Sequence, residues 1–520
     1  MPVDGAVIEG ARPETLEPEY DYVVVGAGAA GCVLANRLSE DGRSSVLAIE
    51  GGGTDIGQAK ISDPRLWPTN FGTDTDWCCT TVPQPHLNGR RIVAPVGKVI
   101  GGGSSINATV WLNGDRADYD AWEAAAGPGW GFDHLIRNFK KAECYAGGES
   151  AMRGGSGMIA TRTPDRSHPV TQAFVESAVA CGKTERHDVN DVAQIGGATG
   201  QNDINTDTAM RRVSAAHGYL RPALQRSNLA LLTHAAVTRL DIAGGECRGV
   251  FVSVAGETRR IGAGQVILSA GGIMSPKLLM LSGIGPADHL RSLGIPVLLD
   301  QPRIGANLHD HLLTRLLFST RSANPPQTDT GHAGIAWHKS SATRRGPDIQ
   351  IFGRMFVPNL PEVKPDEAYA IMVGLMKPKS RGSVRLASAD PDAAPVVDPN
   401  YFADPADVDA CVAGMELALA IGNGPGFDAI RKAQVSIPGG SRADIVAHIR
   451  ANAGTYYHYV GTCEMGTDAS APVDPQLRLR GLSRLRVADA SVMPEVHCCN
   501  THAPTLALAE RAAEIILLKV

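Results

Sequence analysis

The feature that most constrains the fold is an apolar run that enters a glycine-rich turn near the N-terminus, Tyr20–Gly31. The turn holds three glycines, and apolar residues follow it at helical spacing: Gly26, Gly28 and Gly31, then Cys32, Ala35 and Leu38. Strand, tight turn and helix in this order are typical of a dinucleotide-binding unit, because the glycines admit a pyrophosphate and let the helix pack closely on the strand. The N-terminus of the helix, at Ala29 and Ala30, offers free N–H groups to the phosphates.

A second apolar run, Ser45–Ile49, ends in Glu50 about twenty residues after the turn, where an acid that binds the adenosine ribose belongs. An acid at this place also disfavours the 2′-phosphate of NADP. The alternative is an ordinary strand–helix–strand unit with a surface glutamate. Because the segments on both sides of the glycine turn fit a dinucleotide-binding unit, a bound dinucleotide is favoured.

A chain of 520 residues is too long to fold around a single hydrophobic core, so two domains are expected. Five apolar runs predict strands of one parallel sheet: Tyr22–Val25, Val46–Ile49, Leu229–His234, Gln265–Ser269 and Leu485–Ala488. Because these runs are widely dispersed, the dinucleotide domain is predicted to be discontinuous. Gly245–Arg260 alternates apolar and polar residues around a glycine turn and predicts a hairpin before the fourth strand.

The pattern between Asp310 and Asn452 differs and predicts an α+β domain with an antiparallel sheet. Its expected strands and helices are Leu312–Ser319, Asp348–Val357, Tyr369–Met376 and Gly382–Leu386, then the helices Ala406–Ile421 and Arg442–Ala451. The predicted division of the chain is 20–155, 208–308 and 452–520 for the α/β Rossmann-like domain, 156–207 and 309–451 for the second domain, and 1–19 as an N-terminal extension.

Composition excludes several classes of protein. The net charge is −5 with no basic block, which argues against nucleic acid as a partner. No run reaches the roughly 18 apolar residues of a membrane span. The ten cysteines form no CxxC pair, so free thiols in a reducing compartment are expected and no metal site is predicted. The acidic start lacks the features of a signal peptide. We expect a cytoplasmic monomer or small homo-oligomer.

A second glycine-rich loop follows at Gly97–Asn107, with three glycines and two serines in a row. Backbone N–H groups and hydroxyls without bulky side chains can lie directly against a flat ring or a phosphate. A flexible linker is the alternative, and the adjoining apolar residues argue against it.

With this loop the sequence resembles the glucose–methanol–choline (GMC) oxidoreductases. Gly97–Asn107, with Trp111, Gly114 and Asp120, fits the first signature of the family. Gly271–Gly285 fits the second signature except at Gly272, where the family usually has alanine or another small residue. Further similar stretches are Arg303–His311, His458–Gly466 and Leu485–Ile515. The resemblance extends from about Tyr20 to the C-terminus.

The resemblance implies FAD as the cofactor. Some members attach the flavin through a histidine, and Ile106 stands at that position here, so noncovalent FAD is expected. The ADP half is expected at Gly26, Gly28, Gly31 and Glu50, and the adenine at the backbone of Val237. The residues expected around the rest of the cofactor are Gly51, Gly102, Ser105, Asn107, Val110, Ala270, Asp489, Ala490, Asn500 and Thr501.

Alcohol oxidation by a flavin requires loss of a hydroxyl proton and of a hydride, which flavin N5 accepts. Neutral histidine suits the proton transfer. By the resemblance, His458 is the expected general base and His502 the partner that orients the substrate oxygen. His309 and His311 are expected to be structural. Tyr457 or Tyr459, with Pro504, is expected to line the substrate pocket, and spacing does not choose between the tyrosines.

The predicted function is FAD-dependent oxidation of a small primary alcohol to the aldehyde, with O2 or a quinone or dye as acceptor. An aromatic or heteroaromatic alcohol such as pyridoxine is the expected substrate. The alternatives are an aliphatic alcohol or a sugar (sorbose or choline type), a non-redox lyase of the same family, a nicotinamide-dependent dehydrogenase and a flavin-binding protein without activity.

Overall fold

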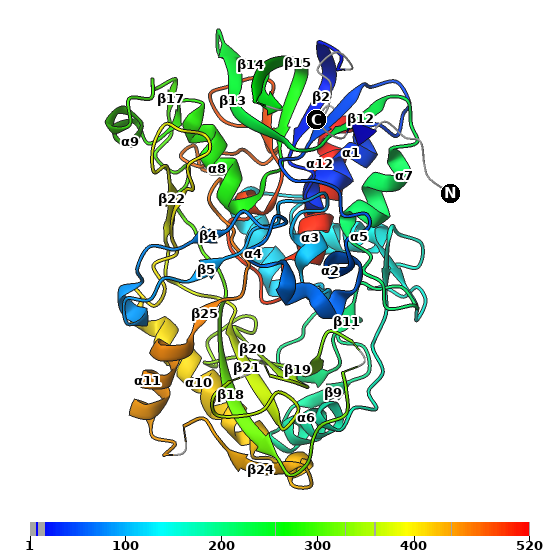
Figure 1. Ribbon diagram of the computed structural model, residues 1–520, viewed down its shortest axis with the longest axis vertical. Helices are drawn as coiled ribbons and strands as arrows, with labels where there is room; N and C mark the ends of the chain where they lie inside the picture. Colours follow the sequence, from blue (N-terminus) through cyan, green and yellow to red (C-terminus); the bar gives the residue numbers. More distant parts are fainter. Residues whose placement is uncertain are drawn as a thin grey trace.

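The computed structural model describes residues 7–8, 16–254, 256–327, 329–357, 360–437 and 439–518. Two eight-stranded sheets lie toward opposite ends of the long axis of the molecule, and short helices and loops fill the space between them (Figure 1). Segments from the N-terminal, middle and C-terminal parts of the chain meet in each half. The α/β and α+β fold class predicted from the sequence is confirmed.

The first sheet has the order β1-β12-β3-β2-β15-β14-β13, with β26 also beside β15. Its central strands are β2 (Glu19–Val25), β3 (Val46–Ile49), β12 (Leu229–Leu232), β15 (Glu257–Leu268) and β26 (Leu485–Val487). These strands correspond to the five predicted ones, and all of them pair in parallel. Their short apolar runs are buried on both faces, as parallel strands require.

An antiparallel ribbon extends this sheet. β13 (Ala235–Ala243), β14 (Glu246–Val254) and the first half of β15 form three consecutive strands. The hairpin predicted at Gly245–Arg260 is therefore confirmed, but its partner β13 was missed. At the opposite edge β1 (Val7–Ile8), from the predicted N-terminal extension, pairs in parallel with β12.

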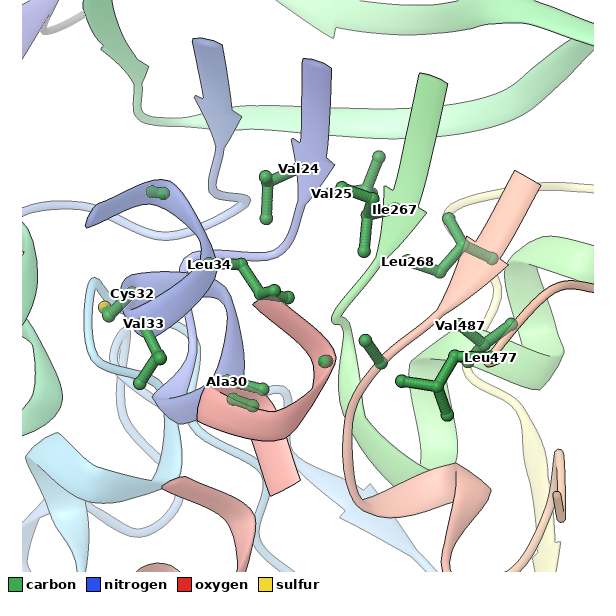
Figure 2. Packing of buried hydrophobic residues seen from close by; sticks show 14 of the residues in the cluster. Val24, Val25, Ala30, Cys32, Val33, Leu34, Ile267, Leu268, Leu477 and Val487 are labelled. Atoms are coloured by element: carbon green, nitrogen blue, oxygen red, sulfur yellow. The ribbon is translucent and has the colours of Figure 1, made fainter. Parts of the chain in front are cut away.

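The core of this half lies between the sheet and two helices, α1 (Ala29–Leu38) and α12 (His502–Leu517). Figure 2 shows Val24 of β2, Ile267 of β15 and Leu34 of α1 among the buried residues of this core. The close packing of α1 on β2 depends on the missing side chain of Gly31, because a Cβ at this position would lie 1.9 Å from the Gly26 carbonyl oxygen. Gly31 thus holds α1 against β2 and fixes the direction in which the turn opens.

The second sheet has the order β24-β18-β21-β20-β19-β10-β9, with β25 beside β18. Its strands are β9 (Thr184–Arg186), β10 (Ala198–Gly200), β18 (Leu312–Thr320), β19 (His332–His338), β20 (Ile349–Arg354), β21 (Ala368–Leu375), β24 (Arg431–Gln434) and β25 (Gly454–Thr455). One face is covered by the helices α6 (Pro169–Ala180), α10 (Pro405–Gly422) and α11 (Arg442–Asn452). The opposite face is turned toward the first domain.

The antiparallel strand predicted at Gly382–Leu386 is confirmed as β22 (Ser383–Arg385). It pairs with β23 (Val396–Asp398) in a separate two-stranded sheet and does not belong to the second large sheet. Local alternation predicts a strand without specifying its neighbour, because pairing is a tertiary property.

Shorter elements connect the two halves. The remaining helices are α2 (Ala59–Ser62), η2 (Pro64–Asn70), η3 (Pro85–Leu87), α3 (Gly103–Ile106), α4 (Arg116–Ala126), α5 (Phe132–Ala142), η4 (Ala216–Leu220), α7 (Arg221–Ala223), α8 (Gly271–Leu281), α9 (Ala287–Ser292), η5 (Pro425–Phe427) and η6 (Ala490–Val492). The remaining short strands are β4 (Cys79–Thr80), β5 (Val93–Ala94), β6 (Val110–Trp111), β7 (Glu143–Tyr145), β8 (Ile159–Thr161), β11 (Asp203–Ile204), β16 (Ile284–Gly285) and β17 (Leu299–Asp300). Within the described ranges, no helix combines the length and apolarity needed to cross a membrane. The pairs β6–β11, β7–β8 and β18–β25 cross the predicted domain limits, which stay a prediction.

Candidate active site

A cavity of about 980 Å³ lies between the two sheets and reaches from the glycine turn after β2 to the loop before α12. It brings together nearly all the residues singled out from the sequence. Those that line it are Gly26, Gly28, Ala29, Ala30, Glu50, Gly51, Gly102, Asn107, Val110, Val237, Ala270, Asp489, Ala490, Asn500, Thr501, Tyr457, His458, Tyr459 and His502. A cavity of this size is in the range of ligand sites.

Three predicted residues lie outside the cavity wall: Gly31, Ser105 and Pro504. Gly31 is behind the turn, where it allows the helix to approach the strand. The Ser105 hydroxyl donates to the carbonyl of Ile100 at 2.7 Å and so closes its own loop. Pro504 is buried in the first turn of α12. Each supports the cavity from behind.

Two glycine-rich segments meet at one end of the cavity. Gly26 has a φ of +96° and Gly102 a φ of +52°, a region that favours glycine. A Cβ on Gly102 would lie 2.8 Å from the Cα of Gly28. The turn before α1 and the loop before α3 are therefore in backbone contact, and together they form a wall without side chains at which a phosphate or a flat ring fits.

Glu50 lies in the cavity wall at the carboxyl end of β3. Its carboxylate accepts hydrogen bonds from the N–H groups of Ala27 at 3.1 Å and Gly52 at 2.9 Å. Burial raises the pKa of this carboxyl to about 7. A buried carboxylate held at the end of the glycine turn suits the hydroxyl groups of a ribose, which would donate to it.

At the other end of the cavity, three histidines form a directed hydrogen-bond chain. The Nε2 of His311 is 2.8 Å from the carbonyl oxygen of His497, and the Nδ1 of His311 is 2.8 Å from the Nδ1 of His458. Burial lowers the pKa of His311 well below its usual value and that of His458 to about 3, so each ring carries one proton.

The direction of the chain follows from its last acceptor. A carbonyl only accepts, so Nε2–H of His311 donates to His497 and leaves Nδ1 of His311 as an acceptor. Nδ1–H of His458 donates to that acceptor. Nε2 of His458 is consequently unprotonated, and His458 lies in the cavity wall. The Nδ2 of Asn500 lies 3.5 Å from this Nε2.

The backbone around His458 is held by Asp310. One carboxylate oxygen accepts from the N–H of His458 at 2.7 Å, and the other accepts from the hydroxyls of Tyr401 and Thr455, each at 2.6 Å. Burial raises the pKa of Asp310 to about 6. Tyr457 has a φ of +69°, a strained conformation that this network maintains.

Three buried polar atoms on residues of the cavity wall have no partner among the described residues: Nε1 of Trp67, Oδ1 of Asn500 and Nε2 of His502. His502 is the first residue of α12, and its ring packs edge-on against Trp111 at 5.7 Å. Burial lowers its pKa to about 3. Unpaired buried groups are costly, so these atoms indicate a polar ligand at this place.

An aromatic wall lies beside the histidines. Trp67 and Phe71, from η2 and the residue after it, pack against Tyr457 with ring centroids 6.3 and 5.2 Å away. Tyr457 is 39% exposed. Tyr459 also lines the cavity, but it is buried and its hydroxyl lies within hydrogen-bond distance of the Thr455 hydroxyl, 2.9 Å away. Tyr457 is therefore the tyrosine with a free face.

Several residues of this site were not expected from the sequence. His311 was expected to be structural but bonds the candidate base, and Trp67, Phe71 and Arg354, which line the cavity, had no expected role. The signal for His311 was its place two residues from His309 in a motif already singled out. The other three carried no local signal, because only tertiary folding brings η2 and β20 to the cavity.

Known proteins with similar sequence and structure agree with this geometry. Two sequence models described as GMC oxidoreductase match residues 20–313 and 378–509. The chain is 37% identical to an oxygen-dependent choline dehydrogenase of Rhizobium etli and 36% identical to an alcohol dehydrogenase (acceptor) of Pseudomonas putida, covering 96% of both chains in each case. The crystal structure of pyridoxine 4-oxidase from Mesorbium loti superimposes with a TM-score of 0.91 at 33% identity, covering 95% of this chain and 98% of that one.

Proposed function

Because the chain belongs to the GMC oxidoreductase family, whose members bind FAD, we propose that it oxidises a small primary alcohol to the aldehyde. The observation that supports this proposal is the histidine chain. It leaves Nε2 of His458 unprotonated in a cavity whose wall also holds unpartnered polar atoms of Asn500 and His502.

The residues fit the cofactor. Gly26, Gly28 and Gly102 form a backbone cradle, and Glu50 is placed to accept from a ribose hydroxyl. Bound FAD would accept a hydride from the substrate carbon at flavin N5. Ile106 lines the cavity and has no nucleophilic atom, which supports noncovalent binding.

The chain's own residues perform the proton chemistry. Nε2 of His458 accepts the hydroxyl proton of the alcohol, and the charge that develops on the ring is shared with His311 through the Nδ1 hydrogen bond. The Nδ2–H group of Asn500 and a ring N–H of His502 donate to the substrate oxygen and stabilise its developing negative charge. Since the site is buried, these hydrogen bonds are stronger than they are in water.

The aromatic wall of Trp67, Phe71 and Tyr457 supports an aromatic or heteroaromatic alcohol, of which pyridoxine is one example, because aromatic rings pack edge-on or offset against one another. A choline-type alcohol is the second candidate. The same aromatic residues can bind a quaternary ammonium group, and relatives carry that name. The acceptor, O2 or a quinone or dye, is part of the proposal.

In the test, purified holoenzyme is mixed anaerobically with a panel of primary alcohols. The measurement is the loss of absorbance at about 450 nm, where oxidised flavins absorb. The His458→Ala variant should retain FAD and lose about 10²- to 10⁴-fold in the rate of bleaching, the usual contribution of a general base.

His86→Ala, at an exposed histidine, is the matched control and should bleach at the wild-type rate. A His458→Ala variant that is reduced as fast as this control would refute the assignment. Oxygen consumption compared with dye reduction then identifies the acceptor.

A further inference from the structure

Two arginines lie on the cavity side of the second sheet, Arg315 on β18 and Arg354 on β20. The register places both on one face. Arg315 aligns with Met372 of β21, which aligns with Phe352, and Arg354 aligns with Ala370, two residues from Met372. Side chains two residues apart on a strand share a face, so both guanidinium groups belong to the same wall of the cavity.

Neither arginine is neutralised. No carboxylate of the described residues lies within the 4.0 Å of an ion pair with either guanidinium group. Asp329 is the acid whose charge acts on Arg354, from beyond ion-pair distance. Its Oδ1 accepts from the N–H of Gly331 at 2.7 Å, and its Oδ2 has no hydrogen-bond partner among the described residues. The Arg354 guanidinium lies instead over two aromatic rings, 6.0 Å from Trp67 and 5.1 Å from Phe356.

The acids of the cavity are on the cofactor side. They are Glu50, Asp392 and Asp489, and none of the described lining residues from β18, β19, β20 or β21 is an aspartate or glutamate. Asp489 accepts from the N–H of Gly271 at 2.8 Å and the Ser275 hydroxyl at 2.5 Å. These carboxylates are therefore not counter-ions for the two arginines.

Arg354 is also close to the reaction centre. Its guanidinium group lies 6.0 Å from the ring of Trp67, which in turn lies 6.3 Å from the ring of Tyr457, the residue before His458. Burial lowers the pKa of Arg354 to about 10, which leaves it protonated at neutral pH. A buried charge without a partner is costly, and a planar guanidinium matches a carboxylate through two parallel hydrogen bonds.

We propose that the substrate is an alcohol that carries a carboxylate, which Arg354 binds and Arg315 attracts, with its aromatic ring against Trp67, Phe71 and Tyr457. This inference rests on the proposed function and specifies its substrate class. It also separates this chain from its choline-dehydrogenase relatives, because a cationic alcohol would meet two unneutralised positive charges in this wall.

The first experiment measures binding without turnover. Holoenzyme is titrated calorimetrically with 4-methylbenzoate and with its neutral isostere 4-methylbenzamide, neither of which carries an alcohol, at a fixed ionic strength of about 0.15 M, because salt screens charges. The carboxylate should bind roughly ten- to a hundredfold more tightly, the usual range for hydrogen bonds to a charged group.

Variants assign the effect to the arginine. Arg354→Gln should reduce the preference for the carboxylate to less than about threefold, and Arg354→Lys, which keeps the charge but loses the planar fork, should retain part of it. Arg315→Gln should weaken the binding of 4-methylbenzoate without abolishing the preference for it over 4-methylbenzamide. Arg345→Gln, at an exposed arginine in the loop before β20, is the matched control and should bind both ligands like wild type.

The second experiment compares kcat/KM for 4-(hydroxymethyl)benzoate, 4-(hydroxymethyl)benzamide and choline. The expected kcat/KM is highest for the carboxylate, lower for the amide and lowest for choline. In Arg354→Gln the ratio of the first two values should fall toward one. Equal binding of the two methyl ligands, or a preference unchanged in Arg354→Gln and Arg315→Gln, would overturn the inference while alcohol oxidation stands. Tight, Arg354-dependent binding of 4-methylbenzoate without oxidation of any alcohol would support the anion site and refute the proposed function.

Discussion

At the scale of single residues, the proton on His458 is placed by its neighbours and not by its own chemistry. The carbonyl of His497 fixes the proton of His311, and His311 fixes that of His458. A histidine with the opposite tautomer would present an N–H to the alcohol and could not accept its proton. His311 is thus a positioning residue. Its effect should be visible at Nε2 of His458, an atom to which His311 is not bonded.

The His311→Leu variant tests this role. Removing the acceptor leaves Nδ1–H of His458 without a partner, so the two tautomers should become mixed and kcat/KM should fall by about ten- to a hundredfold, the scale of other orienting groups. In ¹⁵N-histidine NMR spectra of the wild type, His458 should show an unprotonated Nε2, and in the variant this signal should shift toward the average of the two tautomers.

The exposed His86→Leu variant is the comparison for both measurements, with no change expected. If His311→Leu lowered activity while the His458 signal kept its wild-type position, His311 would act only through packing, and the tautomer argument would be lost.

At the scale of elements, the site depends on contact between two loops that are about seventy residues apart in the chain, a separation that parallel strand–helix units readily bridge. The turn before α1 and the loop before α3 meet at Gly28 and Gly102. Because Gly102 has a positive φ and no room for a Cβ, its replacement has two costs, backbone strain and a clash with the neighbouring backbone.

Gly102→Ala should therefore lower FAD occupancy, measured as the ratio of absorbance at about 450 nm to that at about 280 nm, with an FAD Kd at least about tenfold weaker. Gly89→Ala is the matched control, since Gly89 has a φ of +71° but nothing within 4 Å of the added Cβ. The control should cost only the strain of about 1–2 kcal/mol in stability and keep its FAD. Equal FAD content in the two variants would show that the loop contact does not hold the cofactor.

At the scale of the whole molecule, folding buries six histidines whose pKa values fall: His309, His311, His332, His458, His497 and His502. In the unfolded chain each has a pKa near 6.5 and takes up a proton below that pH, whereas the folded protein does not. The unfolded state then binds more protons, so the free energy of unfolding falls as pH falls, by up to about 1.4 kcal/mol per pH unit for each histidine.

Glu50 and Asp310 oppose this trend, because their raised pKa values, about 7 and about 6, make the folded protein bind protons first. Burial also raises the pKa values of five further carboxyls: Asp115, Asp203, Asp329, Glu464 and Asp489. The histidines still prevail, because five more of them, less deeply buried, also have lowered pKa values. The Tm of the holoenzyme, followed by circular dichroism at constant ionic strength, should therefore decrease from pH 7 to pH 5. His497→Leu should make this decrease shallower by about one proton, and His86→Leu should leave it unchanged. A Tm that stays level or rises toward pH 5 would contradict the argument.

Much of the fold could be predicted because its signals are local. The runs Tyr22–Val25 and Val46–Ile49 and the glycines of the first turn specify parallel strands and a cofactor turn within about thirty residues. β13 was missed, and the sheet to which β22 belongs was not predicted, because the neighbours of both strands are set by pairing across the chain. The boundaries between the two domains, and FAD contacts such as Val237, stay predictions.

The sequence by itself determined the family and the cofactor turn and predicted the two histidines, since glycine positions, an acid after a strand and an ordered set of motifs are properties of the chain. Only the tertiary structure decided which nitrogen of His458 is unprotonated, which tyrosine has a free face, and that Arg315 and Arg354 share one cavity wall without a counter-ion among the described residues. The physical reason is that a proton, an exposed face and an unneutralised charge are each defined by what lies nearby in space, and those neighbours come from distant parts of the chain.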